Sequence, residues 1–87
     1  PTGRAFTKGE ISPLSRKLEQ FDAYIISDET YDFLTYNIPH LSSVQIPKLR
    51  NRTILIGSFS KVFSITGWRV GYVAAPQKIS SEVRKVH

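Results

Sequence analysis

Residues 53–75 read TILIGSFSKVFSITGWRVGYVAA, and this stretch decides the fold. Its first part, Thr53 to Gly57, is a short apolar run typical of a strand that is buried on both faces of a sheet. Its last part, Arg69 to Ala75, predicts a second strand. The connection from Ser58 to Gly67 is predicted to be a loop or turn. At about ten residues it is too short for a parallel crossover, so the second strand should run antiparallel to the first.

A third strand is predicted upstream of this stretch. Ala23 to Ser27 is an apolar run rich in strand-forming residues, and Asp28 with Glu29 ends it. Roughly two dozen residues separate it from Thr53, which is enough for a parallel crossover. Within this interval we expect a short helical turn over residues 30–36 and an irregular connection over residues 37–51.

Helices are predicted on both sides of the strands. Upstream, Thr7 fits a capping box, whereas Pro13 suits the first position of a helix capped by Ser12; the start of this helix stays open, and its body runs to Phe21. Downstream, a helix follows Pro76. Its apolar face would hold Ile79, Val83 and Val86.

Polar and charged residues follow the strands at one edge of the predicted sheet. Asp28 and residues 58–61 lie just beyond the carboxyl ends of two parallel strands. Arg69 begins the antiparallel strand, so it lies at the same edge. Ligands of open α/β sheets bind at this edge. The sequence thus predicts an α/β fold, with two parallel strands plus one antiparallel strand, flanking helices and a ligand site.

Composition limits the classes of function. The 87 residues allow one small domain, with 22% charged residues and a net charge of +5. The twelve Lys and Arg residues are scattered, which favours solvated faces over a nucleic-acid patch. No cysteine is present, so disulfides and thiolate metal sites are excluded. The lack of cysteine is compatible with a reducing compartment, and we expect a cytoplasmic protein.

Three ordered motifs carry a resemblance to a known family. Ser58 to Tyr72 resembles the cofactor-lysine signature of class I/II aminotransferases, which depend on pyridoxal 5'-phosphate. Ile26 to Tyr31 resembles a second motif of that family, and Pro1-Thr2-Gly3 resembles the tail of a third. The ending, residues 79–87, is similar to aminotransferases of the kynurenine, glutamine and methionine group.

The resemblance implies a fold type I enzyme. Residues 1–87 would be a fragment of its large, pyridoxal-phosphate-binding domain, with the small domain outside the chain. Both ends look cut, and we expect the fragment alone to be inactive. The parent would be a homodimer that transfers an amino group between an L-amino acid and a 2-oxo acid.

The resemblance also implies roles for single residues. Lys61 would hold the cofactor as a Schiff base and act as the catalytic residue. Asp28 would pair with the pyridine nitrogen, and Tyr31 would donate to the phenolic oxygen. Ser58 and Arg69 would hold the phosphate, since Arg offers a fork that matches phosphate oxygens. Ser60 is a further candidate, because on a strand it would share a side with Ser58.

Other interpretations stay open. Fold type I also supports lyases, decarboxylases and synthases. Ser58 and Lys61 match the Ser-x-x-Lys motif of penicillin-recognising enzymes, but the Ser-Asp-Asn and Lys-Thr-Gly of that class do not occur, and Ser58 is predicted at a strand end rather than a helix start. A basic domain could bind nucleic acid, although no signature for it is visible. His40 and His87 lack the spacing of metal ligands, so no metal site is predicted.

Overall fold

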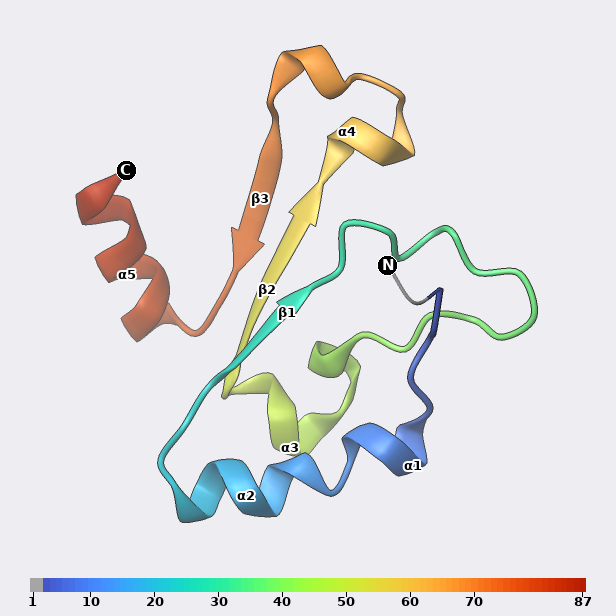
Figure 1. Cartoon of the computed structure of the whole chain (residues 1–87). Helices are drawn as coiled ribbons and strands as arrows, with labels where there is room; N and C mark the ends of the chain where they lie inside the picture. The colour runs from blue at the N-terminus through green and yellow to red at the C-terminus, as the bar shows by residue number, and fades with distance from the viewer. Residues whose placement is uncertain (1–2) are drawn as a thin grey trace.

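A three-stranded mixed sheet organises the chain, as the sequence predicts. The computed structural model describes residues 3–87 and places the strands in the order β1-β2-β3. β1 (Ile25–Asp28) and β2 (Thr53–Ser58) are parallel, and β3 (Gly71–Ala74) runs antiparallel to β2 (Figure 1). The predicted turn at residues 1–3 falls largely outside the described residues.

Two short helices lie upstream of β1; the start after Thr7 is confirmed, whereas Ser12 ends the first helix and Pro13, not Ser12, is the N-cap of the second. α1 (Lys8–Ile11) begins after Thr7, whose backbone N–H donates to the Glu10 carboxylate at 2.8 Å. Pro13 then separates it from α2 (Leu14–Gln20), because proline cannot donate the backbone hydrogen bond that a continuous helix needs. The chain turns into β1 at Asp22, which has a positive φ of 45°.

A small core joins these helices to the crossover between β1 and β2. The predicted irregular connection contains two short elements, η1 (Ser43–Gln45) and α3 (Pro47–Arg50), with proline at the first position of α3. Leu49 is fully buried, and the Thr53 hydroxyl donates to its carbonyl at 2.9 Å. The core is formed by Leu18, Ile46 and Leu49, with Ile11, Ala23, Ile25 and Leu41 packed around it.

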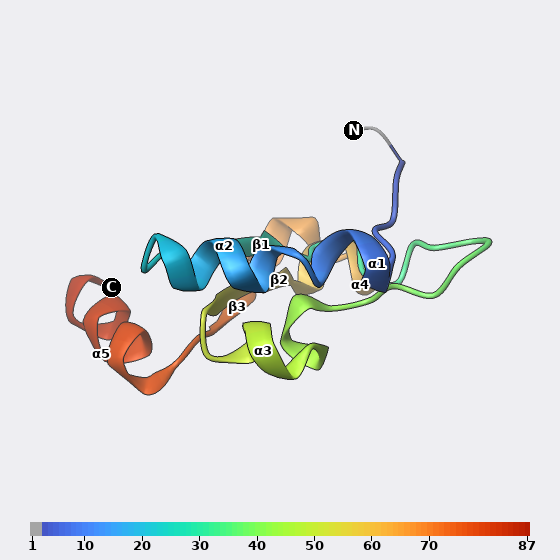
Figure 2. The same ribbon diagram turned by 90° about the horizontal axis from the view of Figure 1, so that it is seen from below.

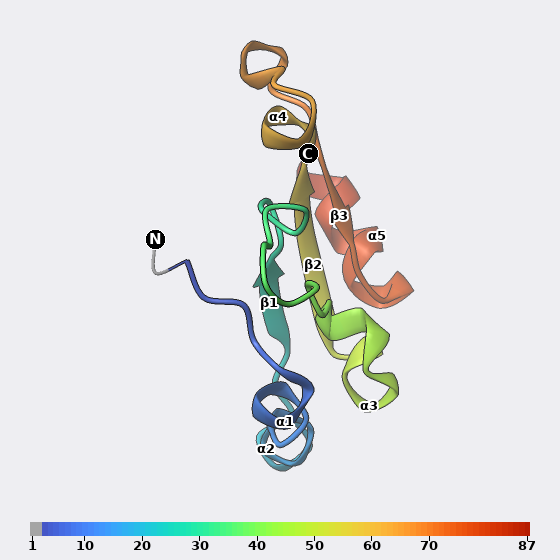
Figure 3. The same ribbon diagram turned by 90° about the vertical axis from the view of Figure 1, so that its right-hand side faces the viewer.

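Within residues 3–87 the strands that the sequence predicts to be buried on both faces of a sheet are covered on one face only. Burial alternates along β1 and β2, because successive side chains of a strand point to opposite faces. Ile25 and Leu55 face the core, whereas Ile26 is 68% exposed on the other face. Figures 2 and 3 show α3 and α5 (Gln77–Val86) on the same side of the sheet. The molecule is thin in one direction, with extents of 40 × 39 × 19 Å.

Residues 58–70 are more ordered than the predicted loop. They form α4 (Phe59–Val62) and the 3-10 turn η2 (Thr66–Trp68). Arg69 ends η2 in a left-handed conformation, and β3 begins only at Gly71, so the prediction that Arg69 starts the strand is wrong.

Two further predictions concern elements near the ends of strands. Residues 30–33 form hydrogen-bonded turns and residues 34–36 are irregular, so the predicted helical turn over residues 30–36 is absent; Asp32 N–H donates to the Glu29 carbonyl at 3.1 Å. The helix after Pro76 is confirmed as α5, although Val86 on its apolar side is 88% exposed. None of the helices within residues 3–87 is long and apolar enough to cross a membrane.

Candidate functional site

The carboxyl ends of β1 and β2 bring two candidate residues together. Asp28 is the last residue of β1 and Ser58 the last of β2. Asp28 pairs in register with Ile56, which lies two residues before Ser58. Alternate residues of a strand share a face, so Asp28 and Ser58 lie on the same face at the same edge. The predicted juxtaposition of these two residues is therefore present.

Asp28 is an exposed carboxylate that local hydrogen bonds keep ionised. Its Oδ1 accepts from the Thr30 hydroxyl at 2.6 Å and from the Thr30 backbone N–H at 3.1 Å. These bonds lower the pKa of Asp28 below its ordinary value, with the hydroxyl bond as the larger cause. The carboxylate therefore stays negative at neutral pH, and its exposed position allows it to face a cationic group of a ligand.

Ser58 connects β2 to α4 and keeps a free donor. Its side-chain oxygen accepts from the Ser60 backbone N–H at 3.2 Å and so caps α4. Ser58 is thus both a strand end and a helix start, rather than a strand end alone as predicted. A hydroxyl has one donor and two acceptor positions, so Ser58 O–H can still donate to a ligand.

The two other candidates on α4 have opposite exposure. Lys61 is exposed on α4, three residues beyond the end of β2. Ser60 is buried, with 8% exposure, and lies in the helix. The reason given for Ser60, that it continues the strand and shares a side with Ser58, is therefore wrong.

Arg69 stays close to this edge although it does not belong to β3. Phe59 N–H donates to the Val70 carbonyl at 3.2 Å, which extends the β2–β3 pairing by one residue. Arg69 has φ 55° and Ser64 has φ 54° in the same connection. A left-handed conformation costs a non-glycine residue about 1–2 kcal/mol. Strain of this kind clusters at ligand sites.

The Arg69 side chain has only a weak contact inside the chain. Its Nη1 donates to the Thr66 carbonyl at 3.5 Å, the limit for a hydrogen bond. Thr66 is tied back to α4, because its hydroxyl donates to the Ser60 carbonyl at 3.4 Å. The guanidinium therefore sits on a braced turn with most of its donors directed to no strong partner among the described residues.

Tyr31 lies in the turn that follows β1. It is three residues beyond Asp28, and its side chain is 57% exposed. The next residue, Asp32, closes this turn through the Glu29 carbonyl. The turn places Tyr31 at the same edge of the sheet as Asp28.

A buried carboxylate beside Asp28 escaped the sequence-based interpretation, which gave Glu29 no role beyond ending the strand. Its side chain is 5% exposed and accepts from His40 Nε2 at 2.8 Å and from the Ser42 hydroxyl at 2.9 Å. The only signal in the sequence is the polar set His40, Ser42 and Ser43 after Pro39. These residues contact Glu29 only in the folded protein, where the crossover passes close to the end of β1.

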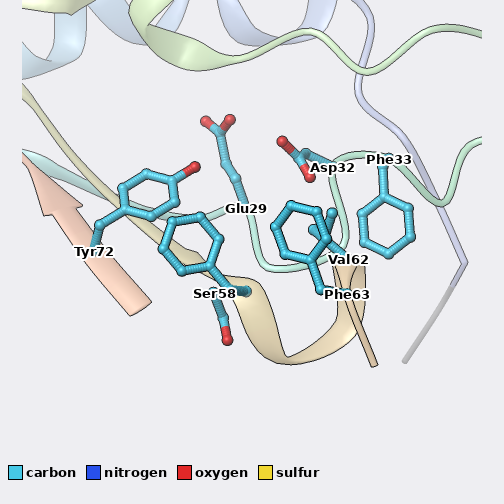
Figure 4. Close-up of a pocket in the computed structure, with 8 residues that line it drawn as sticks. Glu29, Asp32, Phe33, Ser58, Val62, Phe63 and Tyr72 are labelled. Carbon is cyan, nitrogen blue, oxygen red and sulfur yellow. The ribbon is translucent and has the colours of Figure 1, made fainter. Parts of the chain in front are cut away.

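A partly open cavity of about 250 Å³ lies next to these elements, but it is not the candidate site. Figure 4 shows that aromatic side chains dominate it. Phe59 packs against Phe63 and Tyr72, with ring centroids 5.9 and 5.5 Å apart. Neither Lys61 nor Asp28 lines it. The cavity is lined by Glu29, Asp32, Phe33, Ser58, Phe59, Val62, Phe63 and Tyr72.

Comparison with known proteins identifies the family. The sequence model described as "Aminotransferase class I and II" matches residues 1–87. The chain belongs to the class I and II aminotransferases. Human kynurenine–oxoglutarate transaminase 1 is 38% identical over 88 aligned residues, which cover 100% of this chain and 21% of that protein.

Solved aminotransferases share the fold. The Escherichia coli protein YbdL, described as having a methionine aminotransferase function, superposes with a TM-score of 0.92 at 35% identity, over 100% of this chain and 23% of that one. N-succinyldiaminopimelate aminotransferase from Mycobacterium tuberculosis gives a TM-score of 0.90 at 29% identity, over 98% and 22%. The chain therefore spans about a fifth of the length of these aminotransferases.

Proposed function

We propose that the protein that carries this chain transfers an amino group between an L-amino acid and a 2-oxo acid, with pyridoxal 5'-phosphate as its cofactor. Residues 1–87 form part of its cofactor-binding large domain. A homodimer and a cytoplasmic location belong to the same proposal. Substrates named for its relatives include kynurenine, methionine and aspartate.

The observation that carries the proposal is the set of polar groups at one sheet edge. Lys61 supplies an exposed amine, and Asp28 supplies an ionised carboxylate. Ser58 supplies a hydroxyl with a free donor, and Arg69 supplies a weakly engaged guanidinium. The amine matches the aldehyde of pyridoxal phosphate, and the carboxylate matches its pyridine nitrogen. The hydroxyl and the guanidinium both match its phosphate. The residues present fit this cofactor, which when bound supplies a ring that accepts electrons from the reacting α-carbon.

The Lys61 amine would have two roles. Its Nζ would hold the cofactor covalently, and when freed by substrate the same amine would move a proton at the substrate α-carbon. The Ser58 cap fixes the backbone of α4 from which this exposed side chain extends.

The remaining residues would bind and orient. Asp28 would keep the pyridine nitrogen protonated through its negative charge. Tyr31 would donate a hydrogen bond to the phenolic oxygen. Ser58 and Arg69 would hold the phosphate, since charge-assisted hydrogen bonds to phosphate are short and strong. Ser60 is retained as a phosphate candidate, with its backbone N–H already directed to Ser58.

Borohydride reduction of the full-length protein tests the proposal. Reduction should fix a pyridoxyl group on the peptide that contains Lys61, as read by mass spectrometry. Lys61→Ala should lose the label and nearly all turnover. Lys78→Ala, a matched lysine on α5, should retain both. A label found on Lys48 or Lys78 instead would contradict the assignment.

A further inference from the structure

Glu29 is the most heavily bonded side chain at the end of β1. Oε2 pairs with His40 Nε2 at 2.8 Å. Oε1 accepts from the hydroxyls of Ser42 at 2.9 Å and Ser27 at 3.0 Å. It also accepts from the backbone N–H and the hydroxyl of Ser43, each at 3.3 Å. One carboxylate thus joins β1 to both the loop and the 3-10 turn of the crossover.

The charge of this carboxylate is retained in spite of its burial. Burial alone would raise the pKa of Glu29, but hydrogen bonds from His40, Ser42 and Ser27, with the charge of His40, together lower it below its ordinary value. His40 is the one basic side chain in contact with it among the described residues. Asp32 and Tyr72 line the same cavity without bonding to it.

The backbone transmits this anchorage to Asp28. Glu29 N–H donates to the Ile56 carbonyl at 2.8 Å, so the extended pairing with β2 continues one residue past β1. Side chains alternate along extended backbone, and the bond between Ser27 and Glu29 fixes these two on one side. Asp28 must then point to the other side, the face that it shares with Ser58.

We propose that Glu29 is a positioning residue, and that its buried contacts with His40 and the three serines fix the backbone so that Asp28 faces the cofactor. The inference rests on the proposed function and deepens it. Without this anchor, the 28–31 turn would be held mainly by its own short hydrogen bonds. Asp28 and Tyr31 would then sample several directions.

The test uses the full-length protein loaded with pyridoxal phosphate that is labelled with ¹⁵N at the ring. Glu29→Gln keeps the size of the side chain and removes its charge. In this variant we expect the pKa of the ring nitrogen, read from its ¹⁵N shift, to fall by at least about one unit. This fall corresponds to an about tenfold lower affinity for the proton. The value of kcat should fall at least about tenfold, with KM within about threefold.

Matched variants make the result decisive. Asp32→Asn removes a carboxylate from the same turn that has no bond to the network, and it should behave as the unaltered protein. His40→Gln removes the imidazole that bonds to Glu29 Oε2, and it should shift the ring titration in the same direction. This variant replaces Glu29→Gln as the test if Glu29→Gln does not fold. If Glu29→Gln folds and its ring titration is unaltered, the inference about Glu29 is overturned but the proposed function is not. If Glu29→Gln does not fold, an unaltered ring titration in His40→Gln has the same meaning. Absence of bound cofactor in the unaltered protein would overturn the proposed function and this inference with it.

Discussion

Asp28 and Glu29 are neighbours in the sequence with opposite surroundings. Among residues 3–87, the exposed Asp28 side chain is bonded by Thr30 alone, whereas the buried Glu29 side chain is bonded by four other residues. The period-two geometry of extended backbone separates them. One carboxylate is left available for a ligand, and the other becomes part of the scaffold. Chemical type alone does not distinguish the two; the face of the strand does.

Replacement of the exposed carboxylate should affect chemistry more than folding. Asp28→Asn keeps the shape and the bonds to Thr30 but removes the charge that would protonate the pyridine nitrogen. We expect the amino-transfer rate of the full-length protein to fall by on the order of 100-fold or more, with the cofactor still bound. Asp22→Asn is the control, because Asp22 is exposed at the other end of β1 and Asn tolerates its positive φ. Equal rates for the two variants would show that Asp28 is only structural.

At the residue scale, the sequence predicts some positions of the site better than others. The edge positions of Asp28 and Ser58 follow from strand ends and connection lengths, which sequence periodicity reveals. The conformation of Arg69 does not follow, because a left-handed arginine is disfavoured locally and persists only through the surrounding turn. The partners of Glu29 are likewise hidden, since His40 lies eleven residues away and meets it only in the folded crossover.

At the element scale, the close approach of β2 and β3 depends on Gly71. A Cβ at this position would lie 2.7 Å from the Gly57 carbonyl oxygen, and that backbone atom cannot swing aside. Gly71→Ala should therefore destabilise the full-length protein by about 1–3 kcal/mol. Denaturant unfolding measures this.

Gly67→Ala provides the matched control for Gly71→Ala. Open space surrounds the Cβ position at Gly67, so this substitution should leave stability within about 1 kcal/mol of the unaltered protein. If both alanine variants unfold at the same denaturant concentration, the close approach of the two strands does not limit this position.

The elements themselves differ in how clearly the sequence announces them. The three strands and α5 are apolar or amphipathic over enough residues to be recognised. α3 and α4, four residues each, are too short for helix propensity to decide. α3 forms because Leu49 and Ile46 enter the core, and α4 because Ser58 caps it. The core contacts that stabilise α3 have no signature along the chain, and one local serine cap does not distinguish a four-residue helix from a turn.

At the scale of the whole molecule, the sheet has one covered face and one bare face. The buried apolar residues are only Leu18, Ile46, Leu49 and Leu55 among residues 3–87. Ile26 and Val73 remain exposed on the far face, at 68% and 45%. Small chains without disulfides or metals have a stability near zero even with a complete core.

The isolated 87-residue polypeptide should therefore not form a stable monomer, and it should not catalyse amino transfer. We expect a broad, non-cooperative thermal transition by circular dichroism and association in analytical ultracentrifugation. The full-length protein, melted under the same conditions, is the control. A soluble monomer of the isolated chain that melts cooperatively with bound pyridoxal phosphate would disprove this expectation.

The candidate site is built by two connections between strands, and these connections differ in length. Residues 59–70 join β2 to β3 and carry Lys61 and Arg69, whereas residues 29–52 join β1 to β2 and bring Asp28 beside Ser58. The second loop is about twice as long, so its closure costs roughly 0.6 kcal/mol more in chain entropy. The part of the candidate site that holds Lys61 and Arg69 is thus encoded within one β2–β3 connection. The carboxylate half depends on a non-local crossover, which makes it the part of the site with the higher contact order.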